Sequence, residues 1–253
     1  MNPNDRPTLG ADGSPTGDRF ETGAGLQDGF ADGDHGVAGD GAAEYSTGTT
    51  TVGLVAADGV VLATDRRASL GGRFVSNKDV VKVEQVHPTA ALTIAGSVGA
   101  AQAYIKQLRA ESDLYRTRRD RRMSMEALSS VASGLLRGLP VSPLLGGVDP
   151  GTEGAEPHLY QLDGAGGRIE ESAYAATGSG MTVATGALER EYDPDADIEA
   201  VVPTAVDAVL AASERDTASG NGVVVARVTS DGVETERRDG TGALMNGATG
   251  DIQ

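Results

Sequence analysis

The sequence predicts an α+β domain in which two packed β-sheets are covered by layers of helices. Strand patterns alternate with pairs of helical patterns, in the order strands, two helices, strands, two helices, strands. A sheet must bury its apolar face against another element, so this alternation favours two sheets between helix layers. The 253 residues contain no internal repeat and fit one domain with extensions.

Residues 1–48, called the leader below, differ in composition from the rest of the chain. They contain eleven glycines, seven aspartates, no lysine and almost no apolar periodicity. Such a segment cannot bury enough apolar surface to offset the entropy lost on ordering, so we expect it to be disordered. It is either a dispensable acidic tail or a segment that is removed. The folded domain is expected over residues 49–253.

The first strands follow the leader directly. Residues 49–56 (TTTVGLVA) are rich in β-branched side chains, and Asp58-Gly59 is typical of a tight hairpin that returns as residues 60–64 (VVLAT). Residues 74–84 and 90–95 are predicted as further strands, which gives a sheet of at least four strands.

Helical and strand patterns then alternate to the end of the chain. Helices are predicted at 100–119 and 125–137, with Ser124 as N-cap and Pro140 as terminator of the second. A later pair is predicted at 181–192 and about 204–215, where Pro203 suits the first turn. Further strands are expected at 144–148, 158–162, 171–176, 222–229 and 233–237. Residues 240–253 show no clear pattern.

The charge balance excludes some partners. The formal charge is −16, and lysine occurs only at Lys78, Lys82 and Lys106 beside 18 arginines. An acidic surface repels phosphate backbones, so we expect no nucleic-acid partner. Such a surface also stays soluble when salt screens charge repulsion, which favours a halophilic source and predicts that folding or assembly fails in low salt.

Other function classes are excluded by composition. Without cysteine the chain has no disulfide, thiol nucleophile or thiolate metal site. Its three histidines, His35, His87 and His158, have no metal-ligand spacing, so we expect no metal. No apolar run reaches the roughly 18 residues of a membrane helix, and no apolar signal core opens the chain. We therefore expect a cytoplasmic protein without membrane contact.

The junction between leader and first strand offers a candidate nucleophile. The sequence has no G-x-S-x-G elbow, Walker A loop or H-E-x-x-H motif. Taken alone, Thr49 and the two threonines after it are ordinary strand residues. An N-terminal threonine, however, carries its own base, an α-amine with a reference pKa of about 7.7–8. At Thr49 that amine exists only once the Gly48–Thr49 bond is broken, so the uncut leader would also prevent premature proteolysis.

Five blocks of sequence resemble the proteasome β-subunit family in its archaeal form, and the acidity and lysine depletion favour a haloarchaeal member. They follow in the family's order over about residues 49–237: 49–53 (TTTVG) after a glycine, 63–67 (ATDRR), 93–99 (TIAGSVG), 176–180 (ATGSG) and 215–220 (RDTASG). The resemblance implies a four-layer αββα sandwich of the N-terminal nucleophile (Ntn) hydrolase type. It also implies a threonine endopeptidase that degrades unfolded proteins and removes its own leader at Gly48-Thr49.

The resemblance further implies partners. The family forms seven-membered β rings enclosed by rings of α subunits, in a stacked four-ring barrel, and a regulatory unfolding ATPase acts through the α rings. Its substrates are polypeptides. The mechanism needs no metal or organic cofactor.

The same resemblance assigns roles to single residues. Thr49 is the nucleophile, Lys82 matches the catalytic lysine and Asp65 its carboxylate partner, and Gly96 matches the backbone donor to the oxyanion. Three residues match those that orient the amine and a water: Ser179, Asp216 and Ser219. Three others match residues that support this network: Arg67, Gly180 and Gly220. One residue near Gly71-Gly72 is inserted relative to the family pattern.

The residues around Lys82 also favour it as the catalytic lysine. It lies among valines, so we expect it to be buried, and a buried lysine needs an acidic partner. Lys78 lies instead in a predicted turn. Without the resemblance, Asp65, Ser179, Asp216 and Ser219 could be turn or cap residues and Arg67 a surface residue.

The resemblance also indicates which peptide bonds the chain would cut. Ile94 matches a position in the primary specificity pocket, with Ala68 and Val98 as neighbours, and an apolar pocket favours chymotrypsin-like cleavage after large apolar side chains.

The alternative function is a non-catalytic ring subunit, which a mature chain beginning at Thr49 would argue against. The two-ring bacterial relatives are a third possibility, but the chain length and the 215–220 block fit the archaeal form better.

Overall fold

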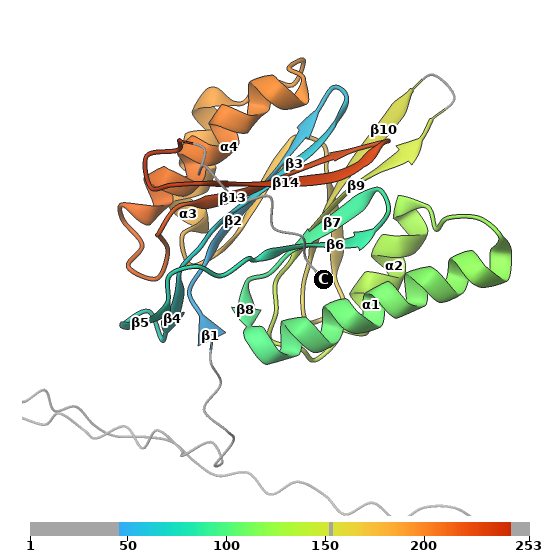
Figure 1. Cartoon of the computed structure of the whole chain (residues 1–253), viewed down its shortest axis with the longest axis horizontal. Coiled ribbons are helices and arrows are strands. Elements are labelled where there is room, and N and C mark those ends of the chain that lie inside the picture. The colour runs from blue at the N-terminus through green and yellow to red at the C-terminus, as the bar shows by residue number, and fades with distance from the viewer. Residues whose placement is uncertain (1–45, 152–153, 244–253) are drawn as a thin grey trace, which may run out of the picture. The chain divides into compact units, whose positions relative to one another are not determined.

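Two five-stranded antiparallel sheets form the centre of the structure, a computed structural model that describes residues 46–151 and 154–243 (Figure 1). The first sheet has the strand order β12-β2-β3-β13-β14. Its strands are β2 (Thr50–Ala56), β3 (Gly59–Asp65), β12 (Tyr174–Gly178), β13 (Val223–Thr229) and β14 (Gly232–Arg238). The second sheet has the order β11-β10-β9-β7-β6. Its strands are β6 (Val83–His87), β7 (Ala90–Thr93), β9 (Leu144–Pro150), β10 (Ala155–Leu162) and β11 (Arg168–Glu171).

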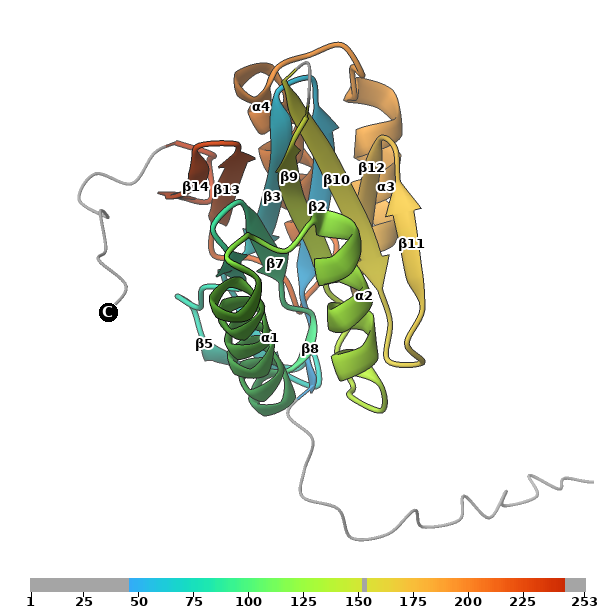
Figure 2. The same cartoon turned by 90° about the vertical axis from the view of Figure 1, so that its right-hand side faces the viewer.

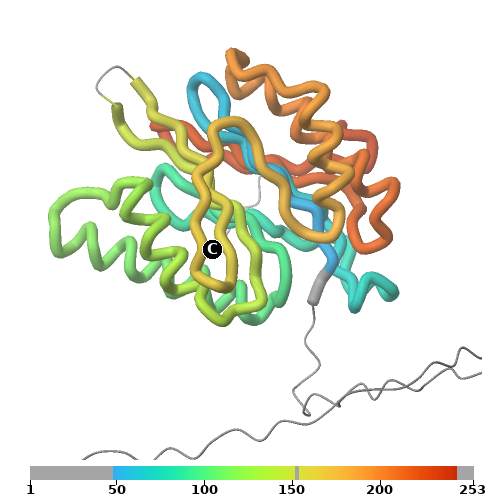
Figure 3. Tube along the Cα trace, turned by 180° about the vertical axis from the view of Figure 1, so that it is seen from behind, coloured from blue at the N-terminus to red at the C-terminus, as the bar shows by residue number. Residues whose placement is uncertain are grey.

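Two pairs of short strands lie at one end of the sheets. The strand β1 (Ser46–Thr47) pairs antiparallel with β8 (Gly96–Ser97), with Thr47 opposite Gly96. The strands β4 (Ala68–Leu70) and β5 (Phe74–Asn77) form a hairpin. Viewed from behind, the first described residues run close to that hairpin, in agreement with the contacts between β1 and β4 (Figure 3). The last residues of the leader therefore extend along the folded domain.

Helices cover the outer face of each sheet. The helices α3 (Met181–Glu191) and α4 (Ile198–Ser213) pack on the first sheet, and α1 (Val98–Arg119) and α2 (Met125–Leu136) pack on the second (Figures 1 and 2). Figure 2 also shows the β13–β14 hairpin and β11 at opposite sides of the layers. This arrangement confirms the four-layer sandwich expected from the sequence.

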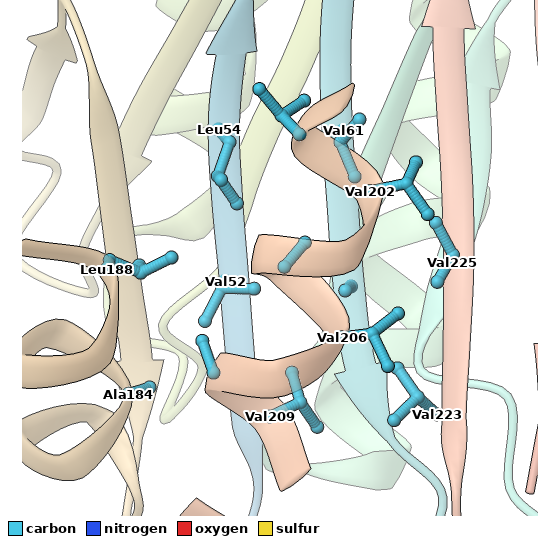
Figure 4. Close-up of a cluster of buried hydrophobic side chains, with 14 of the residues drawn as sticks. Val52, Leu54, Val61, Ala184, Leu188, Val202, Val206, Val209, Val223 and Val225 are labelled. Carbon is cyan, nitrogen blue, oxygen red and sulfur yellow. The ribbon is translucent and has the colours of Figure 1, made fainter. Parts of the chain in front are cut away.

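The side-chain alternation of the central strands explains why both faces are covered. Val52 and Leu54 of β2 face α4 in the outer core, together with valines of β3 and β13 (Figure 4). The alternate residues Val60 and Leu62 of β3 face the second sheet in the core between the sheets. Since successive residues of a strand point to opposite faces, a strand apolar at nearly every position must be buried on both.

A chain of buried threonine hydroxyls crosses between the two sheets. Thr93 of β7 donates to Thr51 of β2 (Oγ1–Oγ1 3.3 Å), and Thr51 lies 2.7 Å from the hydroxyl of Thr177 in β12. Thr177 donates onward to the carbonyl of Ser142 (3.0 Å), and Thr93 accepts from the amide of Leu144 (2.9 Å). Each hydroxyl therefore has both a donor and an acceptor role, which is the condition for burying it without a large penalty.

The structure corrects several strand predictions. Residues 74–84 do not form one strand, because β5 ends at Asn77 and β6 begins only at Val83. The expected sheet of at least four N-terminal strands is also wrong, since β2 and β3 belong to the first sheet and β6 and β7 to the second. Residues 171–176 are divided between β11 and β12, with a bend at 172–173. Local pattern cannot show where a chain leaves one sheet for another.

The start of α4 also differs from the prediction. The helix begins at Ile198, where the carboxylate of Asp197 accepts from the amide of Ala200 (2.9 Å), so Pro203 lies inside the helix rather than in its first turn. Asp58 of the β2–β3 hairpin accepts from the Ile198 amide (2.8 Å) and holds this helix start against the first sheet. The predicted disorder of residues 1–48 and the unpatterned end after residue 243 fall mostly outside the described residues.

None of the helices in the described ranges is both long enough and apolar enough to cross a membrane.

Candidate active site

Thr49 lies at the junction of the leader and the first sheet, fully buried. It directly precedes β2, and the chain is continuous through Gly48, so its nitrogen is a peptide amide. The Thr49 hydroxyl donates to the carbonyl oxygen of Gly48 at 2.7 Å. The candidate nucleophile is therefore held against the peptide bond that was expected to be cut.

Lys82 and Asp65 meet at the same hydroxyl. Lys82 Nζ donates to Thr49 Oγ1 at 3.0 Å and to Asp65 Oδ1 at 2.7 Å. Lys82 is 3% exposed and Asp65 is fully buried, so this is an ion pair removed from water. The lysine precedes β6 instead of lying within a strand, and its carbonyl accepts from the amide of Ile94, the residue after β7, at 2.8 Å.

The Asp65 carboxylate accepts three further hydrogen bonds from backbone amides. Oδ1 accepts from Thr50 (3.0 Å), and Oδ2 accepts from Arg67 (3.0 Å) and Gly220 (2.9 Å). With Lys82, four donors surround one buried carboxylate, which satisfies the lone pairs that burial would otherwise strand. Asp65 therefore fixes the ends of β2 and β3 and the loop after α4 around Lys82.

Burial shifts both charged groups towards neutrality. It raises the pKa of the Asp65 carboxyl and lowers the pKa of the Lys82 amine, and the attraction between the two charges opposes both shifts. Lys82 consequently gives up a proton more readily than an exposed lysine. An amine with a lowered pKa next to a hydroxyl is a chemically suitable base for activating that hydroxyl.

A second network of polar side chains lies at the Thr49 nitrogen. The Thr49 amide donates to Ser179 Oγ at 3.1 Å, and the hydroxyls of Ser179 and Ser219 each donate to Asp216 Oδ2 at 2.6 Å. Thr50 Oγ1 lies 2.8 Å from Ser219 Oγ and completes the network. Thr50 is not among the residues predicted for the site, because its hydroxyl is indistinguishable in the sequence from those of its two neighbours.

Arg67 holds the loop after α4, residues 214–222, and two glycines allow close packing around the site. Arg67 donates to Asn221 Oδ1 and to the Thr217 carbonyl, both at 2.9 Å. A Cβ at Gly220 would stand 2.5 Å from the Arg67 guanidinium, and one at Gly180 would stand 2.0 Å from Thr50 Oγ1. A side chain at either position would therefore collide with a residue of the site, and glycine permits the close approach.

Gly96 lies beside the leader. It pairs with Thr47 and forms an isolated bridge with Val141. Its φ of +119° is a conformation that side-chain-bearing residues rarely adopt, and a Cβ here would stand 2.3 Å from the Pro140 carbonyl oxygen. The residue expected to bind the oxyanion is thus one position away from the Gly48 carbonyl in the strand register.

A pocket of about 170 Å³ opens beside Lys82. The three residues expected to line it, Ala68, Ile94 and Val98, all do so. Its lining also contains polar and charged side chains that the sequence did not indicate, among them Gln102, Lys106 and the ion pair of Arg109 with Glu84 (2.7 Å). The described residues contain no cluster of three or more side chains suited to binding a metal ion.

Comparisons with known proteins show which family the chain belongs to. The model of the family "Proteasome subunit" matches residues 45–228. A "Proteasome subunit beta" of Halorhabdus utahensis is 57% identical over 204 residues, which are 79% of this chain and 85% of the relative. That of Halomicrobium mukohataei is 58% identical over 200 residues, or 78% and 82%. "Proteasome subunit beta 2" of Haloarcula marismortui is 56% identical over 196 residues, or 76% and 83%. The chain therefore belongs to the proteasome subunit family and groups with the β subunits of haloarchaea.

Proposed function

We propose that this chain is a catalytic β subunit of a 20S proteasome, a threonine peptidase that removes its own leader after Gly48. The observation that carries the proposal is the position of Thr49 Oγ1, which lies 2.7 Å from the Gly48 carbonyl oxygen and 3.0 Å from Lys82 Nζ. A nucleophile, the carbonyl it would attack and a buried base thus meet within hydrogen-bonding distance.

Leader removal begins from the uncut chain, in which the Thr49 nitrogen is an amide and cannot act as a base. Lys82 in its uncharged form, which burial favours, therefore takes the proton of Thr49 Oγ1 as the oxygen attacks the Gly48 carbonyl carbon. The carbon–nitrogen bond breaks, the nitrogen receives the proton, and an ester joins Gly48 to Thr49 Oγ1. Water then hydrolyses this ester, which releases the leader and leaves Thr49 with a free α-amine.

Cleavage of other polypeptides uses the new amine as the proton shuttle. Thr49 Oγ1 attacks a substrate carbonyl, the amine carries the proton to the leaving nitrogen, and the acyl-enzyme ester is hydrolysed by water. Ser179, with Asp216 and Ser219 behind it, orients the nitrogen, and Lys82 with Asp65 favours deprotonation of the hydroxyl. The Gly96 amide is assigned to the oxyanion, because preorganised donors stabilise developing charge.

The pocket beside Lys82 supports a preference for apolar residues before the cut. Ala68, Ile94 and Val98 supply apolar surface, while Lys106 and the Arg109–Glu84 pair add charge to its lining. We propose cleavage after large apolar side chains, including those with a polar tip. A peptide panel in which acidic or basic residues are preferred over leucine and tyrosine would contradict this specificity.

Family membership also supports the assembly. Proteasome β subunits assemble in rings with α subunits. We propose seven-membered β rings enclosed by α rings, with a regulatory unfolding ATPase acting through the α rings.

The test of the catalytic role is Thr49→Ala in the full chain, co-expressed with α subunits and kept in high salt. We expect an uncut chain by intact mass and no hydrolysis of apolar peptides, whereas the wild type begins at Thr49. Thr235→Ala, an exposed threonine of β14, is the matched control and should be processed normally. Leader removal or peptide hydrolysis by Thr49→Ala would refute the proposed function.

A further inference from the structure

The last leader residue, Gly48, faces a buried wall formed by Ala218. A methyl group built at Gly48 would stand 1.9 Å from Ala218 Cβ and 3.2 Å from Ala218 Cα. Non-bonded carbon atoms normally approach no closer than about 3.5 Å. Even alanine, the smallest side chain, would therefore collide with this wall.

The wall cannot easily recede, because the loop around it is held on both sides. The Ala218 amide donates to Asp216 Oδ1 and the Ser219 amide to the Asp216 carbonyl, both at 3.1 Å. On the other side, the Thr217 carbonyl accepts from Arg67 at 2.9 Å. Any movement of Ala218 would also displace Asp216 and Ser219, which belong to the network at the Thr49 nitrogen.

A side chain at Gly48 would point towards the loop after α4. The nearest atoms to a Cβ at Gly48 belong to Ala218 and Ser179, and neither residue lines the 170 Å³ pocket. The leader thus enters the site with its last residue turned towards the loop after α4. A substrate whose side chain occupies the pocket must present its backbone differently.

We propose that Ala218 is a specificity-determining residue for leader removal, and that its methyl group makes glycine the required residue before Thr49. The proposal rests on the proposed function, because only a self-cleaving chain needs such a filter. Ala218 thereby separates two substrates of one site. The chain's own leader passes only with glycine at position 48, whereas other polypeptides place a side chain in the pocket.

The experiment exchanges volume across this contact in the full chain, co-expressed with α subunits. Leader removal is followed over time by intact mass for the wild type, Gly48→Ala, Ala218→Gly and the double variant. A displacement of about 1 Å at a reacting centre costs on the order of 100-fold in rate. We expect a loss of about 100-fold in the rate of leader removal for Gly48→Ala, and Ala218→Gly alone is the reference for the double variant. The double variant should recover at least tenfold, though not fully, because Ser179 Oγ remains 3.1 Å from the added methyl group.

A control separates added space from general loosening of the loop. The carbonyl of Ala212, at the end of α4, accepts from the Asp216 amide at 2.8 Å, and no atom of Ala212 is among the three nearest to a Cβ at Gly48. Gly48→Ala combined with Ala212→Gly should stay as slow as Gly48→Ala alone. Recovery in this control equal to that with Ala218→Gly would overturn the proposal.

The outcomes distinguish this proposal from the proposed function. If the wild type is cut after Gly48 but the Ala218→Gly double variant is no faster than Gly48→Ala, the role of Ala218 is refuted and the peptidase stands. If the wild type itself is never cut, both fail. Should Ala218→Gly not fold, Gly48→Ser and Gly48→Val on the wild-type loop replace it. Rates must then fall with side-chain volume, and equal rates for glycine and valine would overturn the proposal.

Discussion

The buried pair of Asp65 with Lys82 allows a quantitative prediction for Asp65→Asn. The substitution keeps the shape of the side chain but removes the charge that faces Lys82 Nζ at 2.7 Å. It also leaves one amide NH₂ among the three backbone donors that the carboxylate accepts from. A buried cation without its partner and a donor facing donors are both unfavourable.

The size of the effect follows from burial. Breaking a buried ion pair by removing one partner destabilises a protein by about 3–5 kcal/mol, so we expect about 4 kcal/mol for Asp65→Asn. For a domain of this size each kcal/mol shifts the melting temperature by about 2–4 °C, which gives a loss of about 8–16 °C. Leader removal should also slow, because Asp65 positions Lys82 against Thr49 Oγ1.

The assay is denaturant unfolding in a Thr49→Ala background, so that leader removal does not change the chain. Salt and protein concentration are matched, since assembly stabilises by mass action. Asp113→Asn is the control, because Asp113 also accepts a guanidinium bond, from Arg116, but the two side chains are 72% and 60% exposed. Exposed pairs contribute about 0–1 kcal/mol. Equal losses for the two variants would refute the argument from burial.

Three further predictions concern stability. Burial lowers the pKa of His87 to about 4, so only the unfolded state binds a proton between about pH 6.5 and pH 4, and stability should fall by about 3 kcal/mol as pH falls through that window. His87→Gln should flatten this part of the pH–stability curve, and an unchanged slope would contradict it. Thr51→Val breaks the hydroxyl chain between the sheets and should lose about 2 kcal/mol in denaturant unfolding, most of which Thr51→Ser should recover. Asp197→Ala removes the N-cap of α4 and should lose about 1 kcal/mol, whereas Asp207→Ala on the exposed face of that helix should lose none by the same measurement.

Much of the fold followed from local pattern. The β2–β3 hairpin and the helices α1, α2 and α3 were predicted within a few residues, because period-2 and period-3.6 spacing and capping residues are properties of neighbouring positions. The partition of strands between sheets was not predictable in this way. The chain leaves the first sheet after β3, forms the β4–β5 hairpin, and enters the second sheet at Val83, and no local signal marks these changes.

For the site, too, some features could be predicted from the sequence and others depended on the tertiary structure. The sequence determined which residue types were present, and motif resemblance singled out Thr49, Asp65 and Lys82. Only the tertiary structure decided that Thr50 completes the network of Ser219. It also decided that Ala218 stands against Gly48, because that contact joins positions 170 residues apart. Local pattern arises from neighbours along the chain, whereas distances and excluded volume at a site arise from segments that meet only when the sheets pack.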